Sequence, residues 1–240
     1  MCWSEPASLA MAGLGAAAAV VTARRGDTPA IPVTLAFFAA MEALQFWGYQ
    51  AIDQCGLPGN RWATILSWVH IALQPTFINA FALAVVAPAL APARRRLVLA
   101  LAGLASALLL LRLAPFGWAG ACLPGTHLCG PDWCTRSGTW HLAWDMPLND
   151  LAGALTGGVL TRWGAYPDYM LAVFVLPLAY GGWRFVLMHA SLGPVLATLL
   201  TDDPGEMPAI WCLFSVGLVL LALSPWLRAR VGPTPARPAG

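Results

Sequence analysis

Long apolar runs alternate with short polar breaks along most of the chain. A membrane-spanning helix needs about 20 mostly apolar residues, and seven stretches come near that length. They are 6–23, 30–52, 62–87, 97–115, 167–183, 185–201 and 207–227. The pattern predicts an all-α integral membrane protein: a bundle of about seven transmembrane helices, forming a single domain over 1–230 with a flexible C-terminal tail at 231–240.

The fifth and sixth runs follow each other almost without a break. A single helix over 169–201 would be roughly 50 Å long at 1.5 Å per residue, which exceeds the hydrocarbon core of a bilayer. Glycine weakens a helix interior, so we place the break between the two spans at Gly181-Gly182.

The region 116–166 is expected to be an external loop followed by an interfacial segment. Its first part is rich in Gly, Pro and Cys, which is typical of a loop. For 140–163 we favour an interfacial or partly re-entrant segment, and an eighth span is the alternative. Tryptophan is enriched at headgroup level, so the expected anchors of this segment are Trp140, Trp144 and Trp163.

The arginines set the orientation of the predicted bundle. With seven spans and the N-terminus outside, nine arginines lie on the cytoplasmic side: Arg24, Arg25, Arg94, Arg95, Arg96, Arg184, Arg228, Arg230 and Arg237. The remaining four are Arg61, Arg112, Arg136 and Arg162. This excess agrees with the positive-inside rule and puts the C-terminus in the cytoplasm. We expect Arg112, near the end of its span, to extend its guanidinium to the interface.

Composition supports the membrane class and excludes others. The chain is 59% hydrophobic and 10% charged, with a mean hydropathy of +0.68, whereas soluble domains carry about a quarter charged residues. A net charge of +2 without a basic run gives no reason to expect nucleic acid as a partner. The start, "MCWSEP", has no basic segment and is not typical of a cleaved signal peptide. We therefore expect a multi-pass protein of a bacterial inner membrane whose partner is the lipid bilayer.

Polar side chains recur at helical spacing inside the second and third spans. They form two stripes: Glu42, Gln45 and Tyr49 on the one, and Ser67, His70 and Gln74 on the other. The two helices run antiparallel, and the 1.5 Å rise per residue puts the stripes at matching depths. The stripes are therefore expected to face each other, with Glu42 level with Gln74, Gln45 with His70 and Tyr49 with Ser67. The expected partner of Glu42 is His70 or Gln74.

Most of these polar groups are explained by hydrogen bonds between helices. A carboxyl group at mid-bilayer is expensive, however, and by default marks a functional site. The candidates for a catalytic role are Glu42, Gln45, His70, Gln74 and His189, and those for cofactor binding are His70, His141 and Arg184. Imidazole and carboxylate groups bind iron or zinc, and a buried histidine can hold haem. The candidate metal ligands are Cys2, Glu42, His70, His189 and Cys212, although no HExxH motif is present.

All six cysteines fall on the outer side of the predicted bundle. Disulfides persist in an oxidising compartment such as the periplasm. One or two bridges are expected among the four loop cysteines, with the pairing left open: Cys55, Cys122, Cys129 and Cys134. Cys2 and Cys212 are expected near the outer face, as buried thiols, a structural disulfide, a redox pair or metal ligands.

Several stretches of the chain resemble an uncharacterised bacterial family of polytopic membrane proteins, a domain of unknown function. They are "MCWSEPAS", "MEALQFWGY", "HIALQPTFINAF", "GTWHLAW", "LPLAYGGWRFVLMHASLGPVLATLLTD" and "EMPAIWCLFSVGL". The resemblance covers almost the whole chain and implies no activity. The motif positions it points to are Cys2, Ser4, Glu42, Gln45, His70, Gln74, His141, Arg184, His189 and Cys212.

Three functions are compatible with this pattern. The first is a buried polar site that opens outward and binds a metal ion, haem or a small ligand, with a link to redox chemistry. The second is a proton- or ion-coupled transporter, in which Glu42 and His70 relay the proton. The third is a seven-helix sensor or a subunit of a membrane complex. A retinal Schiff base is excluded because the chain contains no lysine.

Overall fold

The first half of the chain folds into four long helices. The computed structural model describes residues 4–159 and 166–232; the predicted tail lies almost entirely outside this range. The helices are α1 (Glu5–Arg24), α2 (Ala30–Gln50), α3 (Pro58–Val86) and α4 (Pro92–Leu111). Three of them, α1, α3 and α4, have proline at their first or second position, where its missing N–H removes no helical bond. All four begin and end within a few residues of the predicted spans.

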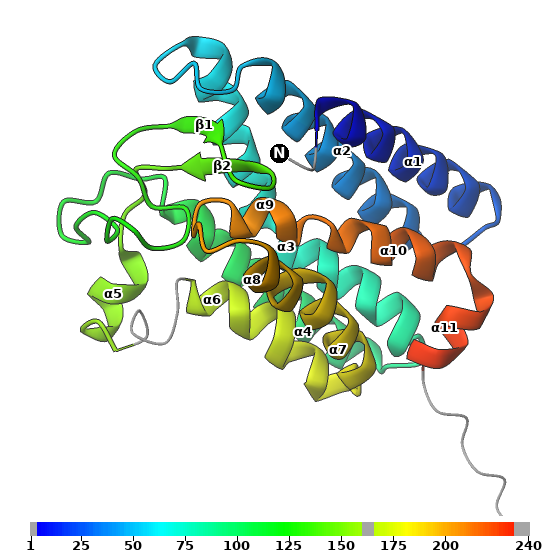
Figure 1. Ribbon diagram of the computed structural model, residues 1–240. Helices are drawn as coiled ribbons and strands as arrows, with labels where there is room; N and C mark the ends of the chain where they lie inside the picture. Colours follow the sequence, from blue (N-terminus) through cyan, green and yellow to red (C-terminus); the bar gives the residue numbers. More distant parts are fainter. Residues whose placement is uncertain (1–3, 160–165, 233–240) are drawn as a thin grey trace, which may run out of the picture.

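A disulfide-bearing cap, residues 112–159, follows α4. It contains an antiparallel hairpin of β1 (Cys134–Ser137) and β2 (Leu142–Asp145), with Cys134 opposite Asp145, and the short helix α5 (Leu151–Thr156). Figure 1 shows the hairpin and α5 at one end of the bundle, away from the last helix. The sequence did not predict these strands.

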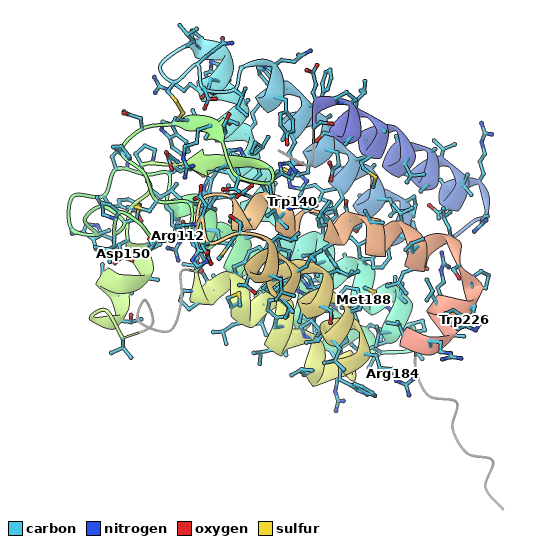
Figure 2. The ribbon with its side chains drawn as sticks, in the orientation of Figure 1. Arg112, Trp140, Asp150, Arg184, Met188 and Trp226 are labelled. Atoms are coloured by element: carbon cyan, nitrogen blue, oxygen red, sulfur yellow. A yellow bond between two sulfur atoms is a disulfide. The ribbon has the colours of Figure 1, made fainter. Side chains whose placement is uncertain are left out.

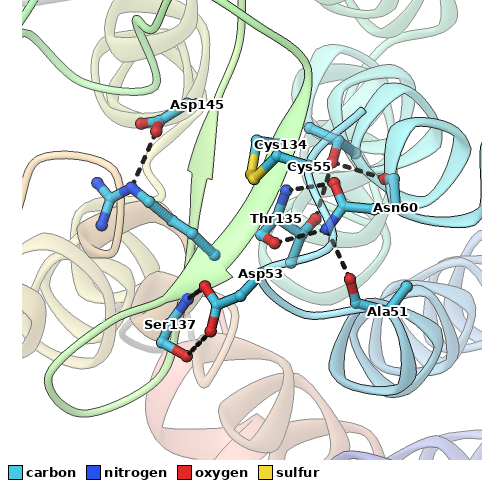
Figure 3. The surroundings of a disulfide bond; sticks show 10 residues. Ala51, Asp53, Cys55, Asn60, Cys134, Thr135, Ser137 and Asp145 are labelled. Carbon is cyan, nitrogen blue, oxygen red and sulfur yellow. Dashed lines mark hydrogen bonds and ion pairs between the residues drawn. A yellow bond between two sulfur atoms is a disulfide. The ribbon is translucent and has the colours of Figure 1, made fainter. Parts of the chain in front are cut away.

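The cap is held to the ends of α2 and α3 by polar bonds. The Asn60 side-chain amide donates to the carbonyls of Ala51 and Thr135 at 2.8 and 2.6 Å, and its oxygen accepts the Thr135 N–H at 2.9 Å (Figure 3). The expectation that Trp144 anchors the chain in headgroups is wrong, because β2 turns this side chain into the core, where it is 1% exposed. Trp163 lies outside the described residues.

Two irregular helical arms come next. The first arm is α6 (Pro167–Met170), the π-helical turn η2 (Leu171–Val175) and the 3-10 turn η3 (Leu176–Tyr180). The second is α7 (Trp183–Ala190), the π-helical turn η4 (Ser191–Val195) and α8 (Leu196–Leu200). The predicted break between them is confirmed, since Gly181 takes a φ of +86°, which glycine adopts without steric cost.

The last expected span, 207–227, is not one straight helix. It consists of α9 (Met207–Trp211) and α10 (Phe214–Leu223), followed by α11 (Pro225–Val231) after a bend of 105°. Pro225 lacks the N–H that would continue the hydrogen-bond ladder, and it stands at the bend.

The described part of the chain has four helices that are long and apolar enough to cross a membrane, or five if the bent pair counts as one span. The four are α1, α2, α3 and the second arm. The first arm is a shorter apolar helix, and α4 carries Arg94, Arg95 and Arg96 near its start.

Basic residues gather at the end of the bundle that lies away from the cap. Arg228 forms an ion pair with Asp27 at 2.8 Å, beside Arg25, whose guanidinium donates to the Leu223 carbonyl at 3.5 Å. Arg184 donates to the Arg230 carbonyl at 3.0 Å. Figure 2 shows Arg184 at this end and Arg112 at the other. The two ends therefore differ in charge and in cysteine content.

Candidate functional site

The polar stripe of α2 faces α9 and α10. Glu42 and Gln45 are 2% and 1% exposed. One oxygen of Glu42 accepts a 3.3 Å hydrogen bond from the Ser215 hydroxyl, and the Cys212 thiol lies beside both Glu42 and Gln45. The other oxygen of Glu42 and both amide atoms of Gln45 have no oxygen or nitrogen partner among the residues described. This stripe is therefore buried, polar and incompletely satisfied.

The α2 stripe reaches the cap at Tyr49. Its hydroxyl donates to Nδ1 of His141 at 3.0 Å, and the same nitrogen accepts the Leu142 N–H at 2.7 Å. Because Nδ1 accepts two hydrogen bonds, the ring is neutral and carries its proton on Nε2. Burial in the cap lowers the pKa of His141 to about 3.

Glu206 lies on the other side of His141 and was not singled out from the sequence. Its carboxylate accepts the backbone N–H groups of Thr139 at 3.2 Å, Trp140 at 2.5 Å and His141. The Thr201 hydroxyl donates to it at 2.5 Å. Four donors compensate the burial of this carboxylate, which is 0% exposed, so it fastens the cap to the start of α9. Nothing in the local sequence indicates these partners, because three of them lie more than 60 residues away.

The stripe of α3 does not meet the stripe of α2. His70 Nε2 donates to the Phe37 carbonyl at 2.8 Å, and its ring stacks on the Phe37 ring with centroids 3.8 Å apart. Gln74 accepts a 2.5 Å hydrogen bond from Tyr169 in the first arm. Ser67 donates to the carbonyl of Ala63 in its own helix.

The expected pairs Glu42–Gln74, Gln45–His70 and Tyr49–Ser67 are therefore wrong. The Phe37 ring of α2 stacks on His70 and Phe77 of α3, and within the α3 stripe Gln74 bonds the first arm. Asn79 of α3 also bonds the first arm. Its side chain donates to the Ala172 carbonyl at 2.8 Å and accepts from the Tyr180 hydroxyl at 3.0 Å.

His189 is completely buried between the second arm and α9. Its Nε2 accepts the indole N–H of Trp211 at 2.9 Å, and the imidazole stacks on Phe214 with centroids 3.9 Å apart. Gly193 makes this possible: a Cβ there would collide with the Trp211 indole. The backbone at Gly193 is not helical (φ −101°, ψ −106°), and Pro194 follows it.

A cavity of about 180 Å³ lies between α3, the two arms and α9–α10. Its wall is mostly aromatic and aliphatic and includes three of the predicted site residues: Gln74, His189 and Cys212. The indole of Trp68 also lines it, and its N–H has no hydrogen-bond partner among the residues described. An apolar chamber with a few polar groups is the usual form of a small-molecule site.

The predicted metal set does not come together. Cys2 lies outside the described residues, His70 is bound to a backbone carbonyl and His189 to an indole. Among residues 4–159 and 166–232, no group of three or more His, Cys, Asp or Glu side chains could hold a metal ion.

The expected haem sites are also not supported by the geometry. A cavity of about 150 Å³ holds a benzene ring, so one of about 180 Å³ has no room for a macrocycle. The cofactor candidates His141 and Arg184 stand at opposite ends of the bundle, because His141 belongs to the cap and Arg184 bonds the carbonyl of Arg230.

The expectation of one or two disulfides is confirmed. Cys55 pairs with Cys134 across 79 residues (Figure 3), and Cys122 pairs with Cys129 across 7. Cys212 is buried and forms no disulfide with any of the described cysteines.

Arg112 does not extend to a lipid interface as expected. It is 4% exposed and forms a 3.0 Å ion pair with Asp168, with its guanidinium over the Tyr166 ring. A partner 56 residues away supplies the counter-charge, so the side chain does not need to reach water.

The chain belongs to a family of unknown function (DUF5765), whose model matches residues 6–232. No curated protein and no solved structure matches the chain.

Proposed function

We propose that this protein crosses a bacterial inner membrane seven times, with the cap outside and the basic end in the cytoplasm. The additional spans would be α4, the first arm and α9–α10. The separation of the arginine-rich end from the disulfide-bearing cap supports this orientation, because cytoplasmic loops are enriched in arginine and disulfides persist outside.

We further propose that the bundle binds one small, largely apolar molecule with one polar group. The observation that carries this proposal is the cavity of about 180 Å³, whose wall includes the Trp68 N–H, which no described residue bonds. Its volume suits one ring with short substituents. The Trp68 indole would donate to a hydroxyl or carbonyl oxygen of the ligand, while the aromatic wall packs against the ring.

Binding of 4-ethylphenol to the purified protein in mild detergent tests this function, with saturation-transfer NMR as the readout. We expect saturable binding that Ala197→Leu abolishes, since Ala197 lines the cavity and a larger side chain would fill it. Leu199→Phe is the control, because Leu199 is 77% exposed on the same helix.

Trp68→Phe keeps the aromatic wall and removes the indole donor. Loss of one hydrogen bond of about 1 kcal/mol should weaken binding roughly fivefold. Non-saturable binding, or equal binding by wild type and Ala197→Leu, would refute the proposed site. A stoichiometric metal or a haem band in the purified protein would also contradict it.

A second candidate is a proton-coupled transporter, which the α2 stripe favours. Glu42 and Gln45 have buried polar atoms that no oxygen or nitrogen of residues 4–159 and 166–232 bonds, and Tyr49 continues the stripe to His141 in the cap. Such atoms are sites for internal water, which carries protons between side chains. This function predicts proton uptake into proteoliposomes under a pH gradient. Glu42→Gln should abolish this uptake. Ser215→Ala, which keeps the carboxyl group, should not.

A further inference from the structure

A surface groove lies beside the cavity, between the two helical arms. Its wall is apolar and consists of Met170, Leu171, Phe174, Val175, Ala190 and Pro194. Met170 and Pro194 also line the cavity. Among the described residues, these two side chains therefore border the cavity on one side and the groove on the other.

Both arms are irregular where they border the groove. The first is π-helical over Leu171–Val175 and the second over Ser191–Val195. π-helical turns widen a helix locally and occur often at functional sites. At Gly193 the backbone also leaves helical geometry, and Pro194 removes one backbone donor. The two arms are thus least regular at the level where they separate the cavity from the surface.

The groove opens on an apolar surface. Leu171, Val175 and Val195 are 54%, 53% and 51% exposed, and none of the described residues that line the groove is charged. In the seven-span arrangement proposed above both arms cross the bilayer, so this surface meets acyl chains. A molecule dissolved in the membrane would reach the cavity through the groove without entering water.

We propose that the ligand is a lipid-soluble molecule with a ring-sized head group and an alkyl chain. The head group enters laterally between Met170 and Pro194 and occupies the cavity, and the chain stays in the groove. This inference rests on the proposed ligand site and adds the class of ligand and its route.

The alkyl chain of the ligand orients the molecule and adds little to its affinity. Acyl chains of the bilayer are as apolar as the groove, so moving an alkyl chain from lipid into the groove gains little hydrophobic free energy. A side chain that fills the groove should exclude a ligand whose alkyl chain must lie there. A short phenol needs only the cavity, so its occupancy at equilibrium should be unchanged.

The test uses the full chain in lipid nanodiscs and two photoreactive phenols. One carries a dodecyl chain with a diazirine at its end, and the other is a short phenol with a diazirine on an ethyl group. We expect the long probe to label residues 170–175 and 190–195, and excess 4-dodecylphenol to compete. The short probe should label the cavity wall, and excess 4-ethylphenol should compete.

Ala190→Trp fills the groove and should reduce labelling by the long probe at least tenfold while sparing the short probe. Val175→Trp does the same from the opposite arm if the first variant folds poorly. Leu187→Trp is the matched control, since Leu187 lies on the same helix, is 58% exposed and does not line the groove.

Each outcome decides one of the two proposals. If the long probe labels all exposed helices equally and 4-dodecylphenol does not compete, lateral entry is overturned. Competed labelling of the cavity wall by the short probe would still support the cavity site. Undiminished long-probe labelling in both groove variants also overturns lateral entry. Absence of competed labelling by either probe would overturn the ligand site itself.

Discussion

Protonation of His141 should loosen the cap at mildly acidic pH. The ring is 1% exposed, and its Nδ1 accepts hydrogen bonds from Tyr49 and Leu142. A proton on Nδ1 would leave the Leu142 N–H without this acceptor, reverse the hydrogen bond with the Tyr49 hydroxyl and place a charge in a buried site. The nearby carboxylate of Glu206 bonds the backbone N–H of His141 and not its ring. The closed cap therefore holds this histidine neutral.

The loss of cap stability follows from the pKa of His141 in two states: the closed cap of the structure, and an open cap in which the ring is exposed to water. In the closed cap the pKa of His141 is about 3, and in the open cap it returns to about 6.5. Between these values the open state binds the extra proton, so stability of the cap falls as the pH drops below 6.5. At pH 5.0 the loss is about 2 kcal/mol relative to pH 7.5, from 1.36 kcal/mol per pH unit below 6.5. The opening equilibrium should rise roughly 30-fold.

Hydrogen exchange of the hairpin amides, residues 134–145, measures this opening once the intrinsic exchange rates are corrected for pH. The control is His141→Asn, whose side-chain oxygen replaces Nδ1 as acceptor but does not titrate. Its opening should depend on pH much less than that of the wild type. Equal pH dependence in the two proteins, or constant protection of the wild type from pH 7.5 to 5.0, would refute the reasoning.

Three further predictions concern stability, each read from thermal or denaturant unfolding in detergent. Gly193→Ala should lower the free energy of unfolding by about 1–3 kcal/mol because the added Cβ displaces Trp211. Gly13→Ala, with open space around it, should be neutral or stabilising. Equal effects of the two substitutions would contradict this reasoning. Arg112→Met should cost about 3–5 kcal/mol by leaving Asp168 unpaired, and adding Asp168→Asn should recover part of the loss; no recovery would show that the ion pair is not the cause. Removing the disulfide that spans 79 residues should cost about 4–5 kcal/mol and the one that spans 7 about 2–3 kcal/mol, as upper bounds from loop closure; the reverse order would contradict the chain-entropy account.

Much of the helical framework could be predicted from the chain itself. Apolar runs of sufficient length located α1 to α4, and glycine at 181–182 located the break between the arms, because both signals depend on local sequence. The four loop cysteines were expected to form bridges, but their pairing needed the cap. The β-hairpin was missed because its strands are only four residues long and their burial comes from contact with α2, α3 and α9.

The candidate site could be predicted only in part. Helical periodicity put Glu42, Gln45 and Tyr49 on one face, and the structure keeps them there, turned toward α9–α10 and the cap. Helical periodicity could not show which neighbouring helix that face would meet, because the rotation of a helix about its axis is set by packing against all its neighbours at once.

The sequence by itself determined where α1 to α4 lie along the chain and which polar residues share a helical face. It also determined which end of the bundle carries the arginines. Only the tertiary structure decided that His70 bonds the Phe37 carbonyl and Gln74 bonds Tyr169, and that Glu206 fastens the cap. The physical reason is range: helix formation and hydropathy act over a few neighbouring residues, whereas a buried polar group takes its partner from whichever distant segment packing brings within about 3 Å.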